Sequence, residues 1–402
     1  MKLGRAISLM AIAMTVAACS SSTATPTPAP ATPAPTAAAT AAATAAATAT
    51  AAASPTAATD LAWAQPIYDA YTKPLSDIGL SVPLTSVPAA HKKVAWLEAA
   101  KVPVFTPAVQ AAAKALNWDL TTITYDDTNP TAVNSAMQQA VDAKVDYIAV
   151  SGASASQFQS ALTNAMQAKI PVFSAFGTDA AQGATNGIYA QIAFNPQTAH
   201  QGELLAALDV VEMGGPGSTV IFNQDDIPSL KNMADGFMAA MAAHCPDCKV
   251  DRQSVAEADV SAGKVPSVVA SYVQSHPDVK VLAFGDGATA LGVDTLLQTG
   301  GLLSKVKIIG QSPEAGSYAS LLAGTNDAWV GNPYRMVMWY CFDAMARYSE
   351  GMSLDVDNSA FMPNPIYAKA ADQAFLKAAQ ANPGEGPTGY QSTFEKLWGV
   401  SQ

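Results

Sequence analysis

The sequence predicts an α/β protein with two doubly wound parallel-sheet lobes joined by a multi-strand hinge. Two observations lead to this expectation. From residue 92 onward, short β-branched segments alternate with helical stretches of about ten to sixteen residues, and such βαβ repetition is typical of a parallel sheet covered on both faces. The roughly 340 residues that remain after the amino-terminal region also exceed what one hydrophobic core usually organises, which favours two lobes.

The chain begins with the layout of an export signal. Lys2 and Arg5 precede an apolar run from Ile7 to Met14, which is too short to span a bilayer. The Val-Ala-Ala-Cys sequence that ends at Cys19 resembles the bacterial lipobox. This resemblance implies that residues 1–18 are a lipoprotein signal peptide and that Cys19 carries the lipid. Ordinary secretion with a chance cysteine at the cleavage site is the alternative.

Residues 19–60 are predicted to form a disordered tether behind the lipidated cysteine. After Cys19 they are almost entirely Ala, Thr, Pro and Ser, with Asp60 as the one charged residue. Such a segment has too little apolar side chain to offset the entropy that ordering would cost. The repeated prolines favour a partly extended chain that holds the following domain away from a membrane.

The charge balance excludes one class of partner. Cleavage after residue 18 removes two positive charges and no negative ones, so the net charge changes from −11 to −13. A chain this acidic, without a basic stripe to neutralise phosphates, is not expected to bind nucleic acid. No later apolar run approaches the length of a transmembrane helix.

The other cysteines suggest a structural role. Cys245 and Cys248 lie in a Cys-Pro-Asp-Cys turn between a helix expected over 229–243 and a strand expected over 249–255. In an exported protein this spacing is interpreted first as a disulfide across a short loop. A redox site would need the motif at the start of a helix, and a zinc site would need two more ligands. Cys341 is expected to be a buried thiol.

The strands and helices follow in order along the chain. The first lobe is expected to contain helices over 107–118, 130–143 and 156–168, and strands over 94–98, 120–125, 146–150, 171–174 and 188–194. After a helix over 197–212, the second lobe is expected to contain strands over 219–223, 250–255, 279–284, 307–310 and 328–331. A closing helix over 333–350 should return to the first lobe, followed by a late crossing over 359–369 and a terminal appendage over 372–402.

These elements predict the division of the chain. Residues 61–91 form an amino-terminal extension that packs back on a lobe or serves as a docking arm, with packing favoured. The first lobe comprises 92–195 and 333–358, and the second lobe comprises 196–332 together with 359–402 and its appendage. Several crossings between two lobes imply a hinge.

Short motifs within this order resemble a known family. They are Lys169-Ile170-Pro171-Val172-Phe173, His276-Pro277-Asp278-Val279, Ala290-Leu291-Gly292 and Asp235-Gly236-Phe237. Their order and spacing over residues 92–350 are similar to type I periplasmic binding proteins, most closely the ribose-binding-like, sugar-type receptors of ABC importers. Repressors that share this fold carry a DNA-binding helix pair where this chain has an export signal.

The ligand is expected in the crevice that faces the carboxyl ends of the strands. Phe105 follows the first strand and is either a stacking face for the ligand or part of the packing of the next helix. Phe176 lies where sugar-binding relatives carry an Asp-Arg clamp, so a phenyl ring there favours a flatter or more apolar solute. Asn195 is expected to bond to a polar ligand or to cap the helix that begins near Pro196.

Three charged residues of the second lobe are further candidates. Asp225 follows a strand and is expected to overhang the crevice, or to be an ordinary solvated loop residue. Lys231 matches a position where many relatives place an arginine, although a lysine lacks the bidentate fork. Asp286 matches the Asn or Asp that relatives direct at the ligand, and its alternative role is to cap a helix that begins near Ala288.

Three polar residues complete the candidate set. Ser312 stands, with Gln311, where relatives often have an aspartate, and Asn332 and Tyr334 lie beside the predicted hinge. Each is polar enough to contact a solute, and each is also common in purely structural positions.

Motifs of catalysis and metal binding are missing from the sequence. It contains no Gly-x-Ser-x-Gly, Walker or His-Glu-x-x-His motif, and its four histidines are dispersed. We therefore expect no enzyme activity, no cofactor and no metal. A glycoside hydrolase that uses Asp225 and Asp286 as its carboxylate pair is the remaining enzymatic hypothesis.

The resemblance and the export signal together imply a function. The chain is expected to be a monomeric, lipid-anchored, extracytoplasmic receptor that captures a small sugar-like solute and delivers it to an ABC permease. The alternative is a ligand-sensing lipoprotein that docks on a membrane receptor, which the sequence does not separate from import.

Overall fold

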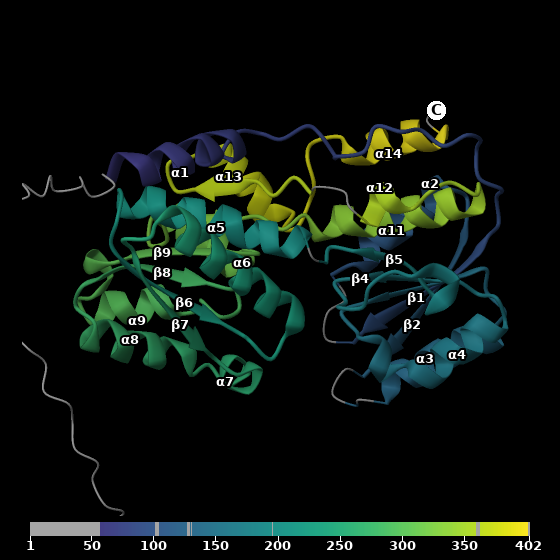
Figure 1. The fold of residues 1–402 in the computed structure, drawn as a ribbon, viewed down its shortest axis with the longest axis horizontal. Helices are drawn as coiled ribbons and strands as arrows, with labels where there is room; N and C mark the ends of the chain where they lie inside the picture. Colours follow the sequence, from purple (N-terminus) through teal and green to yellow (C-terminus); the bar gives the residue numbers. More distant parts are fainter. Residues whose placement is uncertain are drawn as a thin grey trace, which may run out of the picture. The chain divides into compact units, whose positions relative to one another are not determined.

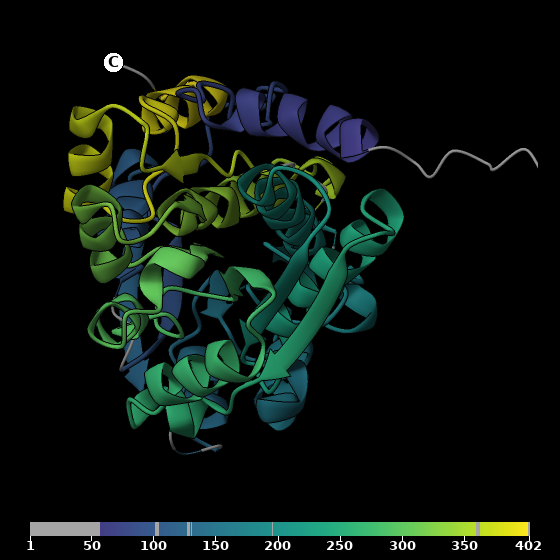
Figure 2. The same ribbon diagram turned by 90° about the vertical axis from the view of Figure 1, so that its left-hand side faces the viewer.

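The structure is a computed structural model that describes residues 57–100, 104–126, 129, 131–194, 196–358 and 362–400. The predicted signal peptide, Cys19 and the tether up to residue 56 lie outside these residues, and so does Asn195. The described chain forms two sheets, each with helices on both faces (Figures 1 and 2). The predicted α/β class with two doubly wound lobes is confirmed.

The first lobe contains a five-stranded parallel sheet in the order β2-β1-β3-β4-β5. Its strands are β1 (Lys93–Ala99), β2 (Asp119–Tyr125), β3 (Tyr147–Ser151), β4 (Val172–Ala175) and β5 (Ile188–Ile192). Its helices are α2 (Thr106–Ala115), α3 (Ala132–Asp142), α4 (Gln159–Gln167), α11 (Tyr334–Ser349) and the short α12 (Asp355–Asn358). Helices α2 and α11 pack on one face of the sheet, and α3 and α4 pack on the other.

The second lobe contains a six-stranded sheet in the order β11-β10-β9-β8-β6-β7. Its strands are β6 (Ser218–Asn223), β7 (Lys249–Ser254), β8 (Val279–Phe284), β9 (Lys307–Gln311), β10 (Ala328–Val330) and β11 (Ile366–Ala368), the last antiparallel to β10. One face packs against α5 (Gln197–Met213) and α6 (Pro228–His244). The other face packs against α8 (Val265–Ser275), α9 (Val293–Thr299), α10 (Ala315–Ala323) and α13 (Gln373–Ala381), while the short α7 (Glu257–Ser261) follows β7.

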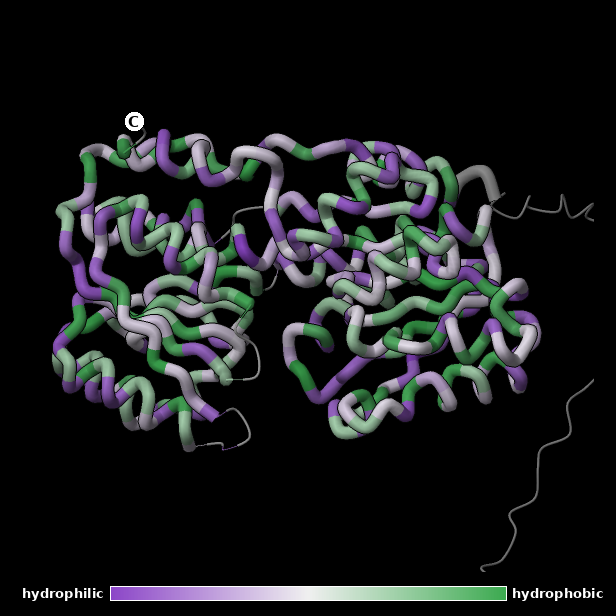
Figure 3. Tube along the Cα trace, turned by 180° about the vertical axis from the view of Figure 1, so that it is seen from behind, coloured by the Kyte–Doolittle hydropathy of each residue, from purple (hydrophilic) through white to green (hydrophobic). Residues whose placement is uncertain are grey.

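Burial differs between the inner strands and one edge of each sheet, while the other edge strands, β5 and β11, are buried. All five residues of the inner strand β3 are buried, because helices cover both faces of a parallel sheet. The edge strands β2 and β7 are largely exposed or half-buried. Figure 3 shows the inner strands mostly green and the outer helices alternating between green and purple. This contrast explains why the apolar runs in the sequence predicted the inner strands.

Two glycines allow α5 and α6 to touch along their backbones. A Cβ atom on Gly202 would lie 2.1 Å from the carbonyl oxygen of Met233, and one on Gly236 would lie 2.4 Å from that of Ala199. Only glycine fits such a close approach. The helix pair forms one wall of the second lobe, and at its end the structure joins Cys245 and Cys248 in a disulfide.

Both ends of the described chain contact the two lobes in turn. Helix α1 (Ala57–Tyr71) packs on the α5 side of the second lobe, and the segment that follows buries Ile78 and Leu80 in the first lobe. Likewise, α13 packs on the second lobe and α14 (Tyr390–Trp398) packs on α11 of the first. The backbone N–H of Leu84 donates to the carbonyl of Leu397, so the two ends meet. Figures 1 and 2 show α1 and the yellow carboxyl-terminal helices on the same side.

The terminal helix differs from the sequence expectation. The sequence places residues 359–402 with the second lobe and treats 372–402 as an appendage, but α14 is part of the core of the first lobe. Tyr390, Phe394 and Trp398 recur at helical spacing and are all buried, and Trp398 stacks on Trp339 with ring centroids 5.2 Å apart. An apolar stripe of this kind requires a partner surface.

A buried charge network holds these segments together. The Nε group of Arg347 donates to Asp343, and the Trp398 indole donates to the other oxygen of Asp343 at 2.6 Å. Arg347 also donates from Nη2 to the backbone carbonyl of Val82 at 2.7 Å. Asp357 lies 3.5 Å from Arg347 Nε, and burial together with the adjacent Asp343 charge raises the pKa of Asp357 well above its usual value. One arginine thus balances one ionised carboxylate, and Asp357 is favoured in its neutral form.

We predict that the two aspartates differ in their contribution to stability. Asp343→Ala should destabilise the protein by about 3 kcal/mol or more, because it leaves the buried Arg347 charge without its main partner. Asp357→Asn should cost less than about 1 kcal/mol, because the amide imitates a carboxyl group that is already neutral. Urea unfolding of both variants at neutral pH measures the difference, and equal losses would contradict it.

We also predict that Asp209 makes stability depend on pH. It is fully buried on α5, accepts a hydrogen bond from the Thr219 hydroxyl at 2.6 Å, and has its pKa raised by burial to about 7. Since the folded pKa exceeds the unfolded value, the stability linked to this group is complete below about pH 4 and is lost as the pH rises through about 7. Asp209→Asn should remove up to about 4 kcal/mol of this pH dependence.

The measurement for Asp209 is the free energy of unfolding from pH 4 to 8. Asp142→Asn on the exposed surface of α3 is the control, since it makes the same change of charge at a solvated position. A slope that is equal in both variants would show that Asp209 does not titrate as predicted.

Candidate functional site

Loops from both sheets line one cavity. It encloses about 480 Å³ and lies where β1 and β4 of the first lobe and β8, β9 and β10 of the second lobe end. Six of the nine ligand-binding residues suggested by the sequence line it: Phe105, Phe176, Asp286, Ser312, Asn332 and Tyr334. These residues come from five separate loops, so only the fold brings them together.

A second cavity of about 370 Å³ shares two of these residues with the first. Phe105 and Phe176 line both cavities and therefore separate them. The second cavity takes most of its lining from the first lobe, including Tyr125, Ser151 and Gln157, and is closed from the second lobe by Ile227 and Glu257. The cleft thus has two chambers with an aromatic wall between them.

Three aromatic rings form a contiguous surface at this wall. Phe105 and Phe176 stack with centroids 5.7 Å apart and an interplanar angle of 22°. Tyr334 meets Phe105 edge to face, with centroids 5.8 Å apart. Behind them, Trp96 contacts Phe105 edge to face from β1. The Phe105 ring packs on the first lobe, which is one of the two sequence-based alternatives, and it also lines the cavity, where its role as a stacking face for a ligand stays a prediction.

Two residues of the cavity have a strained backbone. Phe176 has φ +56° and Ser312 has φ +49°, in the left-handed region that non-glycine residues rarely adopt. Each directly follows a buried strand, β4 or β9, and turns the chain sharply into the cavity loop. Such strain is found mostly where a site requires it, and here it orients a ring and a hydroxyl.

Asp286 uses only one of its carboxylate oxygens within the protein. Its Oδ1 accepts from the Thr289 backbone N–H at 2.8 Å and from the Thr289 hydroxyl at 2.6 Å. This is the turn-capping role that the sequence offered as the alternative. Oδ2 has no hydrogen bond from the described residues, and Asp286 lines the cavity. Burial raises the pKa of Asp286, although the two bonds from Thr289 oppose the shift.

Glu314 is a second carboxylate of this cavity, and the sequence analysis missed it. It precedes α10, where its side chain accepts from the third residue of the helix, and Ser317 bonds back to its N–H. Partial desolvation and the nearby Asp286 charge both raise the pKa of Glu314. The sequence could have indicated Glu314, because it lies two residues after Ser312 in the loop that follows a predicted strand.

A directional chain of hydrogen bonds ends at Asn332. The amide of Gln311 donates to the carbonyl of Gly285, and its oxygen accepts from the Ser312 hydroxyl at 2.7 Å. The Ser312 oxygen in turn accepts from the Asn332 side-chain amide at 3.1 Å. The remaining side-chain oxygen of Asn332 is buried and has no partner among the described residues. The chain of bonds therefore leaves the Asn332 oxygen as an acceptor that no described residue satisfies, enclosed by the protein and not open to the cavity.

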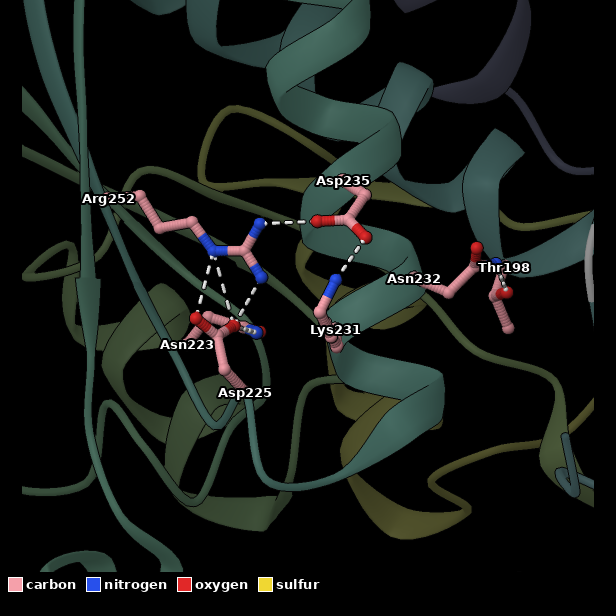
Figure 4. A network of polar contacts seen from close by, with 7 residues as sticks. All are labelled: Thr198, Asn223, Asp225, Lys231, Asn232, Asp235 and Arg252. Atoms are coloured by element: carbon pink, nitrogen blue, oxygen red, sulfur yellow. Dashed lines mark hydrogen bonds and ion pairs between the residues drawn. The ribbon is translucent and has the colours of Figure 1, made fainter.

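Asp225 and Lys231 line neither of these two cavities. Asp225 accepts from the guanidinium of Arg252, with Nε to Oδ2 at 3.1 Å, and also from the Asn223 amide at 2.6 Å. Lys231 pairs with Asp235 at 2.7 Å on the exposed side of α6, and Asp235 also binds Arg252 at 2.6 Å. Figure 4 shows this network at the edge of the second sheet, with Asn232 and Thr198 beside it.

The reason for this difference is an arginine on a neighbouring strand. Arg252 lies on β7, which pairs with β6, and a bidentate guanidinium binds a carboxylate more strongly than solvent does. Asp225 is therefore turned toward the edge strand and away from the cleft. The polar sequence of β7 could have indicated that Arg252 pairs with a carboxylate, but it does not show which loop provides that carboxylate.

Two further findings concern metals and membranes. Within the described ranges, no group of three or more His, Cys, Asp or Glu side chains is placed to hold a metal ion. A search of the same residues for a membrane-crossing helix finds none of sufficient length and hydropathy. The thiol of Cys341 is buried within α11, and burial raises its pKa.

Solved structures share this fold. A solute-binding protein of an ABC transporter from Agrobacterium vitis, bound to α-D-tagatopyranose, matches with a TM-score of 0.58 and 18% identity, covering 71% of this chain and 98% of that one. A protein from Actinobacillus succinogenes with bound D-allose gives 0.59 and 18%, with coverages of 69% and 98%. A 5-methylthioribose transporter protein from Thermotoga lettingae gives 0.59 and 12%, with 79% and 99%.

The sequence itself matches a family model. The model of the periplasmic binding protein domain covers residues 94–353, which include the first sheet except for Lys93 and five of the six strands of the second. No curated protein sequence matches the chain. With the fold, the two-chambered cleft and this match together, the chain belongs to the periplasmic binding protein family and has its type I, ribose-binding-like fold.

Proposed function

We propose that the protein is the extracytoplasmic receptor of an ABC importer, which captures a small polar solute between its lobes and presents it to the permease. The observation that carries this proposal is the cavity lined by loops of both lobes, because a ligand that contacts both sides favours their closure. The similar structures that hold tagatose, allose and 5-methylthioribose support a solute of this size.

The cavity residues divide into two roles in this proposal. Phe105, Phe176 and Tyr334 offer ring faces against which a sugar-like or flat solute stacks. Asp286 offers a free carboxylate oxygen that fixes the orientation of the solute through hydroxyl or N–H groups, and Glu314 adds a second carboxylate to the same lining. In this proposal the apolar area of the rings supplies most of the affinity. The carboxylate oxygens select among solutes of similar shape.

The proposal includes a membrane anchor. Lipid on Cys19 would hold the receptor at the membrane, and residues 19–60 would give it the reach to meet its permease. A single-chain receptor that does not self-associate fits this arrangement, and chemistry on the bound solute is not part of the proposal.

We predict that solutes which bind will stabilise the protein against heat. The full mature chain, with Cys19 replaced by serine, is screened by thermal shift against sugars, polyols, nucleosides and small amines. A solute at a hundred times its dissociation constant adds about 2.7 kcal/mol of stability, which raises the melting temperature measurably. If no class of compound raises the melting temperature, the result counts against solute capture. If the protein converts a bound solute chemically, it is an enzyme and the receptor proposal is wrong.

For any solute that binds, we predict that Asp286→Ala weakens binding by about 2 kcal/mol or more, because a buried hydrogen bond to a charged group is lost. Isothermal titration calorimetry measures the change. Asp225→Ala is the matched control, since the structure turns that carboxylate toward Arg252 and away from the cavity. Equal losses in both variants, or an unchanged affinity in Asp286→Ala, would remove Asp286 from the site.

We predict that Cys19 decides where the protein is found. In a bacterial host, the native chain should sediment with membranes and partition into detergent, because two or three acyl chains anchor a protein stably. Cys19→Ser should release it into the soluble extracytoplasmic fraction, whereas Ser22→Ala, a neighbouring substitution outside the lipobox, should not. Membrane association of Cys19→Ser would exclude the lipid anchor.

A further inference from the structure

The chain of hydrogen bonds behind the first cavity has a fixed direction. It begins at the carbonyl of Gly285, which can only accept, so the amide group of Gln311 must point its N–H atoms there. The oxygen of Gln311 then takes the Ser312 proton, which leaves Ser312 to accept from the Asn332 amide. Each step determines the next, and the chain ties Gln311, Ser312 and Asn332 to one another, while the Asn332 oxygen stays enclosed in the protein.

Two carboxylates supply hydrogen-bond acceptors to this cavity. Asp286 Oδ2 is free of hydrogen bonds from the described residues, and an ionised carboxylate can only accept. Glu314 adds a second carboxylate at the same cavity. Among the described lining residues there is no Lys, Arg or His. Two carboxylates without a basic partner favour a ligand that donates hydrogen bonds.

The nearest cations along the chain do not neutralise these carboxylates. Lys231 follows the cavity residue Leu230 but pairs with Asp235 at 2.7 Å. Arg335 follows Tyr334 but donates to Glu385 at 2.9 Å. Both basic side chains are paired with carboxylates outside the cavity lining. Neither therefore neutralises the negative charge that Asp286 and Glu314 give to the described lining.

The aromatic wall also favours a positively charged ligand. Phe105, Phe176 and Tyr334 line the cavity that also holds Asp286 and Glu314. The face of an aromatic ring carries partial negative charge and attracts a cation, most strongly where water is excluded. Rings and carboxylates around one space therefore favour the same ligand group.

We propose that the first cavity binds a solute that carries a protonated amine, with its ammonium group held between Asp286, Glu314 and the aromatic wall. An amino sugar or a small organic amine has this chemistry. The inference rests on the proposed function and narrows its solute class from neutral sugars to amines.

The alternatives for this cavity fit the described residues less well. An anionic solute would meet two carboxylates and no base in the described lining. A bare metal ion would need at least a third ligand of the kind that the described residues do not gather at any point. A neutral sugar would satisfy the acceptors but would leave the negative charge uncompensated.

The test compares amines with neutral molecules of the same shape. The full mature chain carrying Cys19→Ser is titrated with D-glucosamine and D-glucose, and with D-galactosamine and D-galactose, at a pH where the amines are protonated. We expect at least one amine to bind about tenfold or more tightly than its neutral partner, as a charge-assisted hydrogen bond implies. We expect Asp286→Asn to abolish that ratio.

Two further variants distinguish an effect on the binding site from an effect on folding. Asp259→Asn removes the same charge from an exposed position of the second lobe, where Asp259 pairs with Lys264, and should keep the ratio. Glu314→Gln removes the second carboxylate of the lining while its amide oxygen can still cap α10, and should lower the ratio even where the melting temperature is unchanged. If Asp286→Asn does not fold, Glu314→Gln alone decides the proposal.

Each outcome has one meaning. Neutral members that bind as tightly as the amines would overturn the amine preference and leave solute capture standing. A panel in which nothing binds at millimolar concentration would also overturn it, while the wider thermal-shift screen would still decide solute capture. An amine preference that survives in both Asp286→Asn and Glu314→Gln would place the ammonium elsewhere and overturn the proposed site.

Discussion

The buried ion pair between Asp343 and Arg347 is the interaction on which most of the structure depends. A charge inside a core persists only when it is paired and hydrogen-bonded, so the partners of this pair are fixed in place. They include the amino-terminal segment, through the carbonyl of Val82, and the terminal helix, through the Trp398 indole. Because α11 is one rigid helix, the same pair fixes Tyr334, which begins α11 inside the cleft.

The cleft combines an aromatic wall with polar groups, and these two properties arise from different lobes. Its aromatic wall depends on loops of the first lobe, where the left-handed backbone of Phe176 brings one ring against another. Its polarity depends on the second lobe, where a chain of hydrogen bonds starting at one backbone carbonyl orients two amides and a hydroxyl. A solute between the lobes would meet an apolar face on one side and acceptor oxygens on the other.

The fold and the family identify the kind of receptor, but not its solute. Similar structures hold different sugars at 12 to 18% identity, because the sheets are maintained by burial while the loops that contact the solute vary. In this chain the loop after β4 carries a phenyl ring where sugar-binding relatives are expected to carry a charged clamp. Together with two carboxylates and no base in the described lining of the first cavity, this substitution is consistent with an amine-bearing solute.

The sequence by itself determined the two lobes, their inner strands and most of the first cavity. Continuous apolar runs mark strands buried on both faces, and in parallel sheets the residues after such strands share one edge, which is why Phe105, Asp286 and Asn332 were found. Only the tertiary structure decided which of the polar loop residues line the first cavity. Asp225 does not line it, because Arg252 reaches Asp225 from a paired strand. The place of α14 was misjudged because its apolar stripe finds its partner, Trp339, far away in the chain. Such long-range pairings depend on how the elements pack, and local sequence patterns do not carry that information.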